Sequence, residues 1–298
     1  MKTFKEKYII EGILKSVKAG ASANLEDYVK DDYVLRNYAQ IKDNGIYLPQ
    51  NIDFTVRGER CCGAWIKEGG TITYDGGVGD MLFLPKKANS VRIVNCEGIK
   101  SIWVDDGTEI GKLEIEGDFG TEEIDLSKVT IKRLSIDKTN IKSIKFGNVT
   151  SFDMMDCKKL KTITGDELKQ IRIYKSNIQN IKLNKLGKLE IKNCRKTTKI
   201  DIDVPVIDDI LISAGQALKK ITFNKSLTVN NLTISYCDVL TTIDAPNMDC
   251  KNTFRLNALM ALEKNEFARK MKCVLYISRV KTTPIINCKK IIRDYDKR

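Results

Sequence analysis

An internal repeat fills the C-terminal two-thirds of this 298-residue chain and limits what it can fold into. Segments spaced by 18 to 22 residues align on a first apolar residue. These first residues are Val91, Leu113, Leu134, Phe152, Ile171, Leu189, Ile210, Leu232, Phe254 and Leu275. In every segment a second apolar residue follows two positions later, so the same short pattern recurs ten times.

The spacing within each segment predicts a coil that needs its neighbours. An apolar-x-apolar triplet is typical of a short strand with one buried face. A further isoleucine lies ten or eleven residues after the first position in nine segments, and only the ninth has Asn265 there. One coil cannot bury its apolar edge alone, whereas stacked coils bury it jointly in a parallel sheet. Coils this short leave little room for a helix, so we expect short strands, 3₁₀ turns or extended chain opposite the sheet.

A column of small residues follows the strands. Five positions after the first apolar residue stand Cys96, Cys157, Cys194 and Cys237, with Ser176 and Gly215 at the same place. Residues of this kind fill a tight turn and satisfy its backbone. Since the nearest of the four thiols are two coils, or roughly 10 Å, apart, we expect buried thiols and no disulfide among them.

The strings CEGIKSI, CKKLKTI and CDVLTTI resemble the C-x-x-L-x-x-I core of BspA-like (treponemal-type) leucine-rich repeats. The resemblance covers roughly residues 88–290 and implies a leucine-rich-repeat-like solenoid without implying a function. This sequence departs from the family by lacking its Ala-Phe pair and by its less regular coil length. A right-handed parallel β-helix is therefore the alternative fold.

The sequence before the repeats predicts a small mixed α/β region. Residues 1–49 form a partly helical docking segment, with one helix over 4–17 and a second from Asn24 to Gly45. Residues 50–88 are rich in strand patterns and serve as an N-terminal cap, with a turn at the glycine-rich Asp75–Asp80. The solenoid then spans 89–290, and 291–298 is a charged tail.

Several kinds of chemistry are disfavoured by composition. The chain has no histidine and no C-x-x-C spacing, so we expect no cofactor, no metal site and no catalytic triad. No secretory signal or long apolar run is evident, which predicts no membrane insertion and a cytoplasmic or virion location. Among nine cysteines, only Cys61 with Cys62 and Cys250 with Cys273 are candidates for oxidation.

Two surfaces are candidate binding sites. The outward strand positions carry mixed side chains, among them Asp153 and Glu190, and tyrosines among charges suit a protein interface. The binding candidates on this strand face are Arg92, Arg172, Tyr174, Lys192, Arg255 and Tyr276. The turns carry a basic ridge made of Lys158, Lys159, Lys161, Arg195, Lys196, Lys199, Lys219 and Lys220.

The functional hypothesis is a non-catalytic repeat scaffold for protein–protein interaction or for attachment in a larger assembly, for example a bacteriophage virion. One alternative is a carbohydrate-binding or carbohydrate-active β-helix using Glu114, Glu116 and Asp137. Another is a binder of an anionic surface, because residues 86–298 hold 40 basic and 27 acidic residues, a net +13, against 11 and 12 in residues 1–85. Sequence-specific nucleic-acid binding is disfavoured, because no aromatic residues are interleaved with the ridge.

Overall fold

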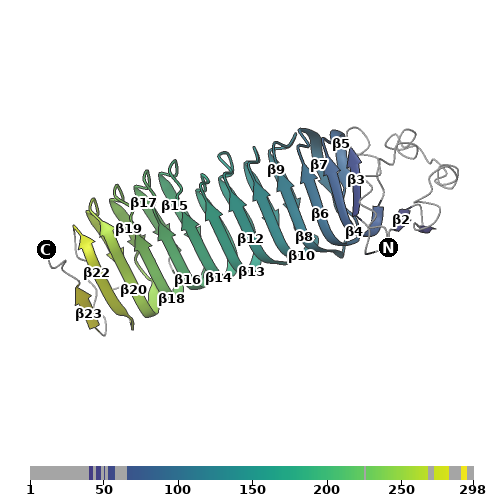
Figure 1. The fold of residues 1–298 in the computed structure, drawn as a ribbon. Coiled ribbons are helices and arrows are strands. Elements are labelled where there is room, and N and C mark those ends of the chain that lie inside the picture. Colours follow the sequence, from purple (N-terminus) through teal and green to yellow (C-terminus); the bar gives the residue numbers. More distant parts are fainter. Residues whose placement is uncertain are drawn as a thin grey trace, which may run out of the picture. The chain divides into compact units, whose positions relative to one another are not determined.

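The computed structural model of the chain is a parallel β-solenoid of about ten turns (Figure 1). It describes residues 40–42, 45–47, 50, 53–57, 66–224, 226–267, 272–281 and 290–293. The chain divides into two compact units, one of Met1–Ile141 with Lys145–Val149 and one of Lys142–Ile144 with Thr150–Arg298. Every regular element in the described ranges is a strand. These ranges contain no helix that is long and apolar enough to cross a membrane.

The first unit is built on one parallel ladder. Its strands are β3 (Asp53–Arg57), β4 (Ile66–Asp75), β6 (Lys87–Val94), β8 (Thr108–Glu116) and β10 (Val129–Asp137). Val91 lies opposite Leu113, and Leu113 lies opposite Leu134, which confirms the predicted register. The ladder starts earlier than Val91, because Ile72 of β4 pairs with Val91 and with Phe54 of β3. The strand-rich stretch 50–88 therefore belongs in part to the same sheet.

The N-terminal edge of this ladder corrects one prediction. The sequence predicts a helix from Asn24 to Gly45, but β1 (Gln40–Lys42) and β2 (Gly45–Tyr47) form an antiparallel hairpin. Ile46 of β2 pairs with Ile66 of β4, so the hairpin obtains backbone partners from the sheet that a helix would forgo. The remainder of the two predicted helices, in residues 1–39, lies outside the described residues.

The second unit has the same design, and its two longest strands have 13 residues each. Its main ladder consists of β12 (Val149–Met155), β13 (Thr162–Tyr174), β14 (Asn180–Lys192), β16 (Val206–Ser213), β18 (Thr228–Ser235), β20 (Asp249–Leu259), β22 (Val274–Val280) and β23 (Lys290–Arg293). All seven first positions from Phe152 to Leu275 pair in series as the sequence predicted.

Short strands lie on the other side of the coils, as expected from the coil length. In the first unit these are β5 (Val78–Phe83), which pairs with β7 (Gly98–Trp103), and β9 (Glu123–Leu126). In the second unit they are β15 (Lys199–Asp203), β17 (Lys220–Phe223), β19 (Thr242–Ala245) and β21 (Lys264–Phe267), paired in series. The remaining strand, β11 (Ser143–Phe146), lies where the chain passes between the units.

The isoleucine column on this side has one local shift. Ile163 pairs with Ile181, but Ile181 then pairs with Ile202 instead of Ile200. Six residues separate β14 from β15 but only five separate β13 from β14, and a shift of two residues keeps the same side of the strand inward. Ile200 is itself fully buried and pairs with Ile221, so the column resumes in the next coil.

The core holds a third apolar column that the sequence analysis did not identify. Most of its members lie three residues before the first position of each strand, and all are buried. They are Ala88, Ile110, Ile131, Val149, Leu168, Leu186, Ile207, Val229 and Cys250. The strand triplets, the isoleucine column and this third column all carry buried side chains. Together these side chains fill the interior of each coil.

A residue with left-handed backbone conformation lies at or near the end of most main strands in the described ranges. The residue four positions after the first apolar one has φ between 51° and 57° at nine non-glycine positions. These are Asn95, Lys138, Asp156, Lys175, Asn193, Ala214, Tyr236, Ala258 and Arg279. Gly76 and Gly117 occupy the same place in two other coils. In these described coils the repeated left-handed residue turns the chain off the sheet.

The small-residue column begins directly after this residue and confirms its predicted role. The Cys157 amide donates to Ser176 Oγ (3.0 Å), and Ser176 Oγ donates to the Tyr174 carbonyl (2.8 Å). Likewise, the Gly77 amide donates to Cys96 Sγ (3.2 Å). Burial raises the pKa of the Cys194 and Cys237 thiols to about 11, so these thiols are inert structural groups.

The two cysteine pairs proposed for oxidation differ in outcome. Cys250 and Cys273 are both buried free thiols, and a hydrogen bond links their side chains across neighbouring coils, so they stay a candidate pair for oxidation. That hydrogen bond and burial raise the pKa of the Cys250 thiol. Cys61 and Cys62 lie outside the described residues.

Candidate functional site

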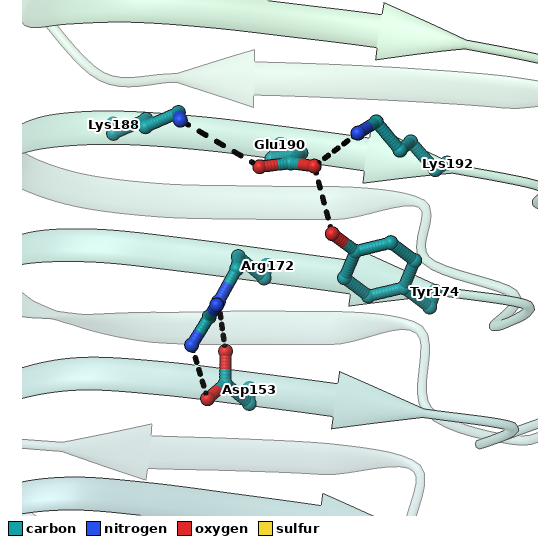
Figure 2. A network of polar contacts seen from close by, with 6 residues as sticks. All are labelled: Asp153, Arg172, Tyr174, Lys188, Glu190 and Lys192. Carbon is teal, nitrogen blue, oxygen red and sulfur yellow. Dashed lines mark hydrogen bonds and ion pairs between the residues drawn. The ribbon is translucent and has the colours of Figure 1, made fainter.

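The sheet face of the second unit carries a network of polar side chains (Figure 2). Asp153 of β12 and Arg172 of β13 occupy paired positions in adjacent coils. Arg172 donates from Nε to Asp153 Oδ1 (2.5 Å) and from Nη2 to Oδ2 (2.9 Å), which is a two-point contact. Such bidentate pairs fix the guanidinium plane as well as its position. The Asp153 hydrogen bond also raises the pKa of Arg172, which stays charged.

Glu190 of β14 is the centre of the second half of the network (Figure 2). Tyr174 Oη donates to Glu190 Oε1 (2.7 Å), and Lys192 Nζ lies 2.5 Å from the same oxygen. Lys188 Nζ lies 3.7 Å from Oε2. Burial of Glu190, which is only 7% exposed, opposes ionisation, but the hydrogen bonds from Lys192 and Tyr174 outweigh it and lower the pKa of the carboxyl. The carboxylate is therefore held ionised beneath the tyrosine and the lysine.

The six residues predicted on the strand face do not form one cluster. Arg172, Tyr174 and Lys192 are brought together by the Asp153 and Glu190 contacts. Arg255 of β20 instead stacks over the Tyr276 ring of β22, with 5.2 Å between the guanidinium carbon and the ring centroid. Arg92 belongs to the first unit, where its Nε lies 3.5 Å from Glu114 Oε2.

The repeat pattern predicts Asp153 and Glu190 as outward residues but not as members of a site. Adjacent strands lie roughly 4.8 Å apart, so side chains at equivalent positions of neighbouring coils are in contact range. The predicted register, which aligns Phe152 with Ile171, therefore already places Asp153 beside Arg172. Glu190 is harder to identify, because it also reaches diagonally to Tyr174 and along its own strand to Lys188 and Lys192.

The basic ridge lies on the turns and the strand starts that follow them. Three of its eight members ion-pair: Lys158 with Asp156 (3.9 Å), Lys199 with Asp201 (2.7 Å) and Lys220 with Asp244 (3.8 Å). The other five make no ion pair with any described residue, and all five are exposed: Lys159, Lys161, Arg195, Lys196 and Lys219.

A groove of about 400 Å³ interrupts the ridge between the turns after β12 and β14. Its lining comes from three successive coils and consists of Asp156, Lys158, Lys175, Ser176, Asn177, Asn193, Arg195 and Lys196. The sequence pattern predicts Lys158, Arg195 and Lys196 as members of the ridge but does not predict a role for Lys175, Asn177 and Asn193. These three lie in the turns between ridge segments, where their composition alone gives no signal.

The three acidic residues considered for glycan chemistry lie in the first unit, and each of them forms an ion pair. Glu114 contacts Lys112 (2.7 Å) as well as Arg92. Glu116 and Asp137 occupy paired positions of β8 and β10, and the Lys138 ammonium lies 3.8 Å from Glu116 and 3.2 Å from Asp137. Structurally, the lysine serves as a counter-ion shared by two neighbouring carboxylates.

Comparison with known proteins yields no relative for this chain. No family model matches it, and neither a curated protein nor a solved structure matches it significantly. Within the described part of the chain, no group of three or more histidine, cysteine or acidic side chains could hold a metal ion.

Proposed function

We propose that the protein is a non-catalytic scaffold that binds a protein partner, or attaches within a larger assembly, through the sheet face of its second unit. The contact surface comprises Arg172, Tyr174 and Lys192 with their supporting acids Asp153 and Glu190. The proposal rests on the hydrogen bonds and the ion pair that fix these side chains on adjacent coils.

Side chains that are fixed before binding favour association, because fixing a mobile side chain at an interface costs free energy. An immobilised long side chain costs about 0.5–1.5 kcal/mol on association. Here Arg172 and Tyr174 are already held by Asp153 and Glu190, so part of that cost is met during folding. Tyrosine and arginine are also the residues that most often dominate interface energies. Next to them, Met155 is 50% exposed and adds apolar area to the same strand end.

Pull-down from cells of the source, followed by mass spectrometry, tests this proposal with a set of matched variants. Tyr174→Ala removes the ring, and Tyr174→Phe keeps the ring but releases Glu190. We expect the first to abolish capture of the partner and the second to weaken it. Tyr236→Ala is the control, because Tyr236 is an exposed tyrosine in the turn beyond β18. Equal capture by all four proteins would contradict the proposal.

The bacteriophage setting and the BspA-like resemblance remain proposals of the same kind. Both are compatible with a stacked scaffold that carries one binding face. Mass-spectrometric identification of the captured partner would address the setting directly: a particle protein would support a virion role, and a soluble cellular protein would count against it.

A further inference from the structure

The groove in the basic ridge has its origin in the unequal lengths of three successive turns. Ile163, Ile181 and Ile202 are paired across the coils, so they mark the same place in each. Ile163 follows the column residue Cys157 by six residues, and Ile202 follows Cys194 by eight. In the coil between them, Ile181 follows Ser176 by only five. The short turn is therefore recessed between two longer ones.

The two longer turns and the recessed one supply an excess of positive charge. Lys158 comes from one side, Arg195 and Lys196 from the other, and Lys175 from the recessed coil, against Asp156 alone. Asp156 contacts only Lys158 among them (3.9 Å), while Lys175, Arg195 and Lys196 are exposed and form no ion pair with described residues. Cations held in adjacent coils repel one another, and a bound anion would relieve that repulsion.

The rest of the lining is polar, and some of its hydrogen-bonding groups already have partners within the protein. Ser176 is only 2% exposed, and its hydroxyl is engaged by the Cys157 amide and the Tyr174 carbonyl. The single Thr197 hydroxyl proton is shared between the Ser176 carbonyl (3.2 Å) and Asn177 Oδ1 (3.4 Å), while the Asn177 NH₂ group donates to no other described residue. Asn193 adds a second amide, which is exposed, whereas Asn177 is half-buried. The lining thus combines cations with neutral donors and contains no aromatic or large apolar side chain.

We propose that this groove binds an acidic saccharide, with its carboxylate or sulfate groups on Lys175, Arg195 and Lys196. The side-chain amides of Asn177 and Asn193 would form hydrogen bonds with the sugar hydroxyls. A nucleic-acid strand normally needs aromatic side chains for its bases, which this groove lacks. A volume of about 400 Å³ is within the range of small-ligand sites, roughly 300–1,000 Å³.

The site is distinct from the proposed protein interface, because the groove lies in the turns and the interface lies on the strands. The two proposals can therefore fail separately. Tyr174→Ala should leave saccharide binding unchanged, and loss of groove charges should leave capture of the protein partner unchanged.

Isothermal titration calorimetry of the full chain with size-defined hexasaccharides tests the inference. Heparin hexasaccharide carries sulfate and carboxylate groups, hyaluronan hexasaccharide carries carboxylates alone, and maltohexaose is neutral. We expect at least one acidic hexasaccharide to bind, maltohexaose not to bind, and added salt to weaken the affinity. The heparin and hyaluronan arms distinguish sulfate from carboxylate recognition.

Variants decide whether the groove is the binding site. Arg195→Ala with Lys196→Ala should lower the affinity by about tenfold or more, since each tenfold corresponds to about 1.4 kcal/mol. Asn177→Phe should also lower it, because it obstructs the groove without changing its charge. Lys185→Ala with Lys251→Ala removes the same charge from exposed positions outside both the groove and the basic ridge and should change the affinity by less than about twofold.

Three results would overturn the inference. The first is an absence of binding by both acidic hexasaccharides to a folded chain. The second is an equal loss of affinity in the two double variants, which would indicate non-specific attraction to net charge. The third is inorganic polyphosphate binding as tightly as the best saccharide while being insensitive to Asn177→Phe, which would indicate that charge alone is recognised.

Discussion

At the scale of single residues, the left-handed position that ends each strand is the most demanding feature. For an L-residue with a Cβ this conformation costs about 1–2 kcal/mol. The chain nevertheless has alanine, tyrosine or a charged residue there in most coils. Packing of the neighbouring coils holds these residues in place, so strain is distributed along the stack.

Replacing Ala214 by glycine tests this strain directly. Ala214 has φ of 57°, so glycine should relieve the Cβ penalty and raise the free energy of unfolding by about 1 kcal/mol. Urea denaturation monitored by circular dichroism measures the change. Ala217→Gly is the control, because Ala217 is not among the left-handed positions and should lose stability. Ala214→Gly behaving like Ala217→Gly would show that the left-handed residue is not strained.

The buried cysteines make stability depend on alkaline pH. Burial raises the pKa of Cys194 and Cys237 from 9.0 to about 11, so the unfolded chain loses these protons before the folded one does. Their contribution is complete below pH 9 and is lost as the pH rises towards 11, by about 2–3 kcal/mol for each thiol.

The double variant Cys194→Ser with Cys237→Ser isolates this effect, because serine does not ionise in that range. We expect the unfolding free energy of the wild type to fall more steeply than that of the variant between pH 9 and 11. Lysine and tyrosine titrations are common to both proteins and cancel in the comparison. Parallel curves would mean that the thiols are not desolvated in the folded state.

At the scale of elements, strands were predictable and turns were not. The apolar triplets recur in every coil, so the pairing of Phe152 with Ile171 and Ile171 with Leu189 followed from sequence alone. The third apolar column escaped notice because it changes between Ala, Val, Leu, Ile and Cys and shifts at a bulge near Cys250. The repeat pattern also does not predict the turn lengths, since it aligns Ile181 with Ile200 whereas Ile181 pairs with Ile202. The groove depends on those lengths, so it could not be predicted.

A buried position on a short strand should be intolerant of charge. Ile200 of β15 is fully buried and pairs with Ile221, so Ile200→Asp should lower the unfolding free energy by about 3 kcal/mol or more. Thermal or urea unfolding measures it. Thr198→Asp is the matched control, because Thr198 is exposed two residues earlier and should change stability by less than about 0.5 kcal/mol. Similar losses in both variants would contradict the assigned register.

At the scale of the whole molecule, each coil of a unit contacts chiefly the coils before and after it, as in other repeat proteins. Stacking brings residues about 20 positions apart into pairs such as Asp153 with Arg172. Surface chemistry is therefore set by the sequence of coils, and one short turn is enough to create the groove. Both proposed binding sites depend on this stacking register within the second unit.

Pulsed electron paramagnetic resonance between spin labels on the sheet face measures that register most directly. Five pairing steps separate Arg172 from Tyr276, six separate Asp153 from Tyr276, and seven separate Asp153 from Ile292. At about 4.8 Å per step, labels introduced through non-natural amino acids should lie roughly 24, 29 and 34 Å apart. Distances that rise by about 5 Å with each added strand would support the in-register stack. Distances that do not increase with the number of strands would contradict it.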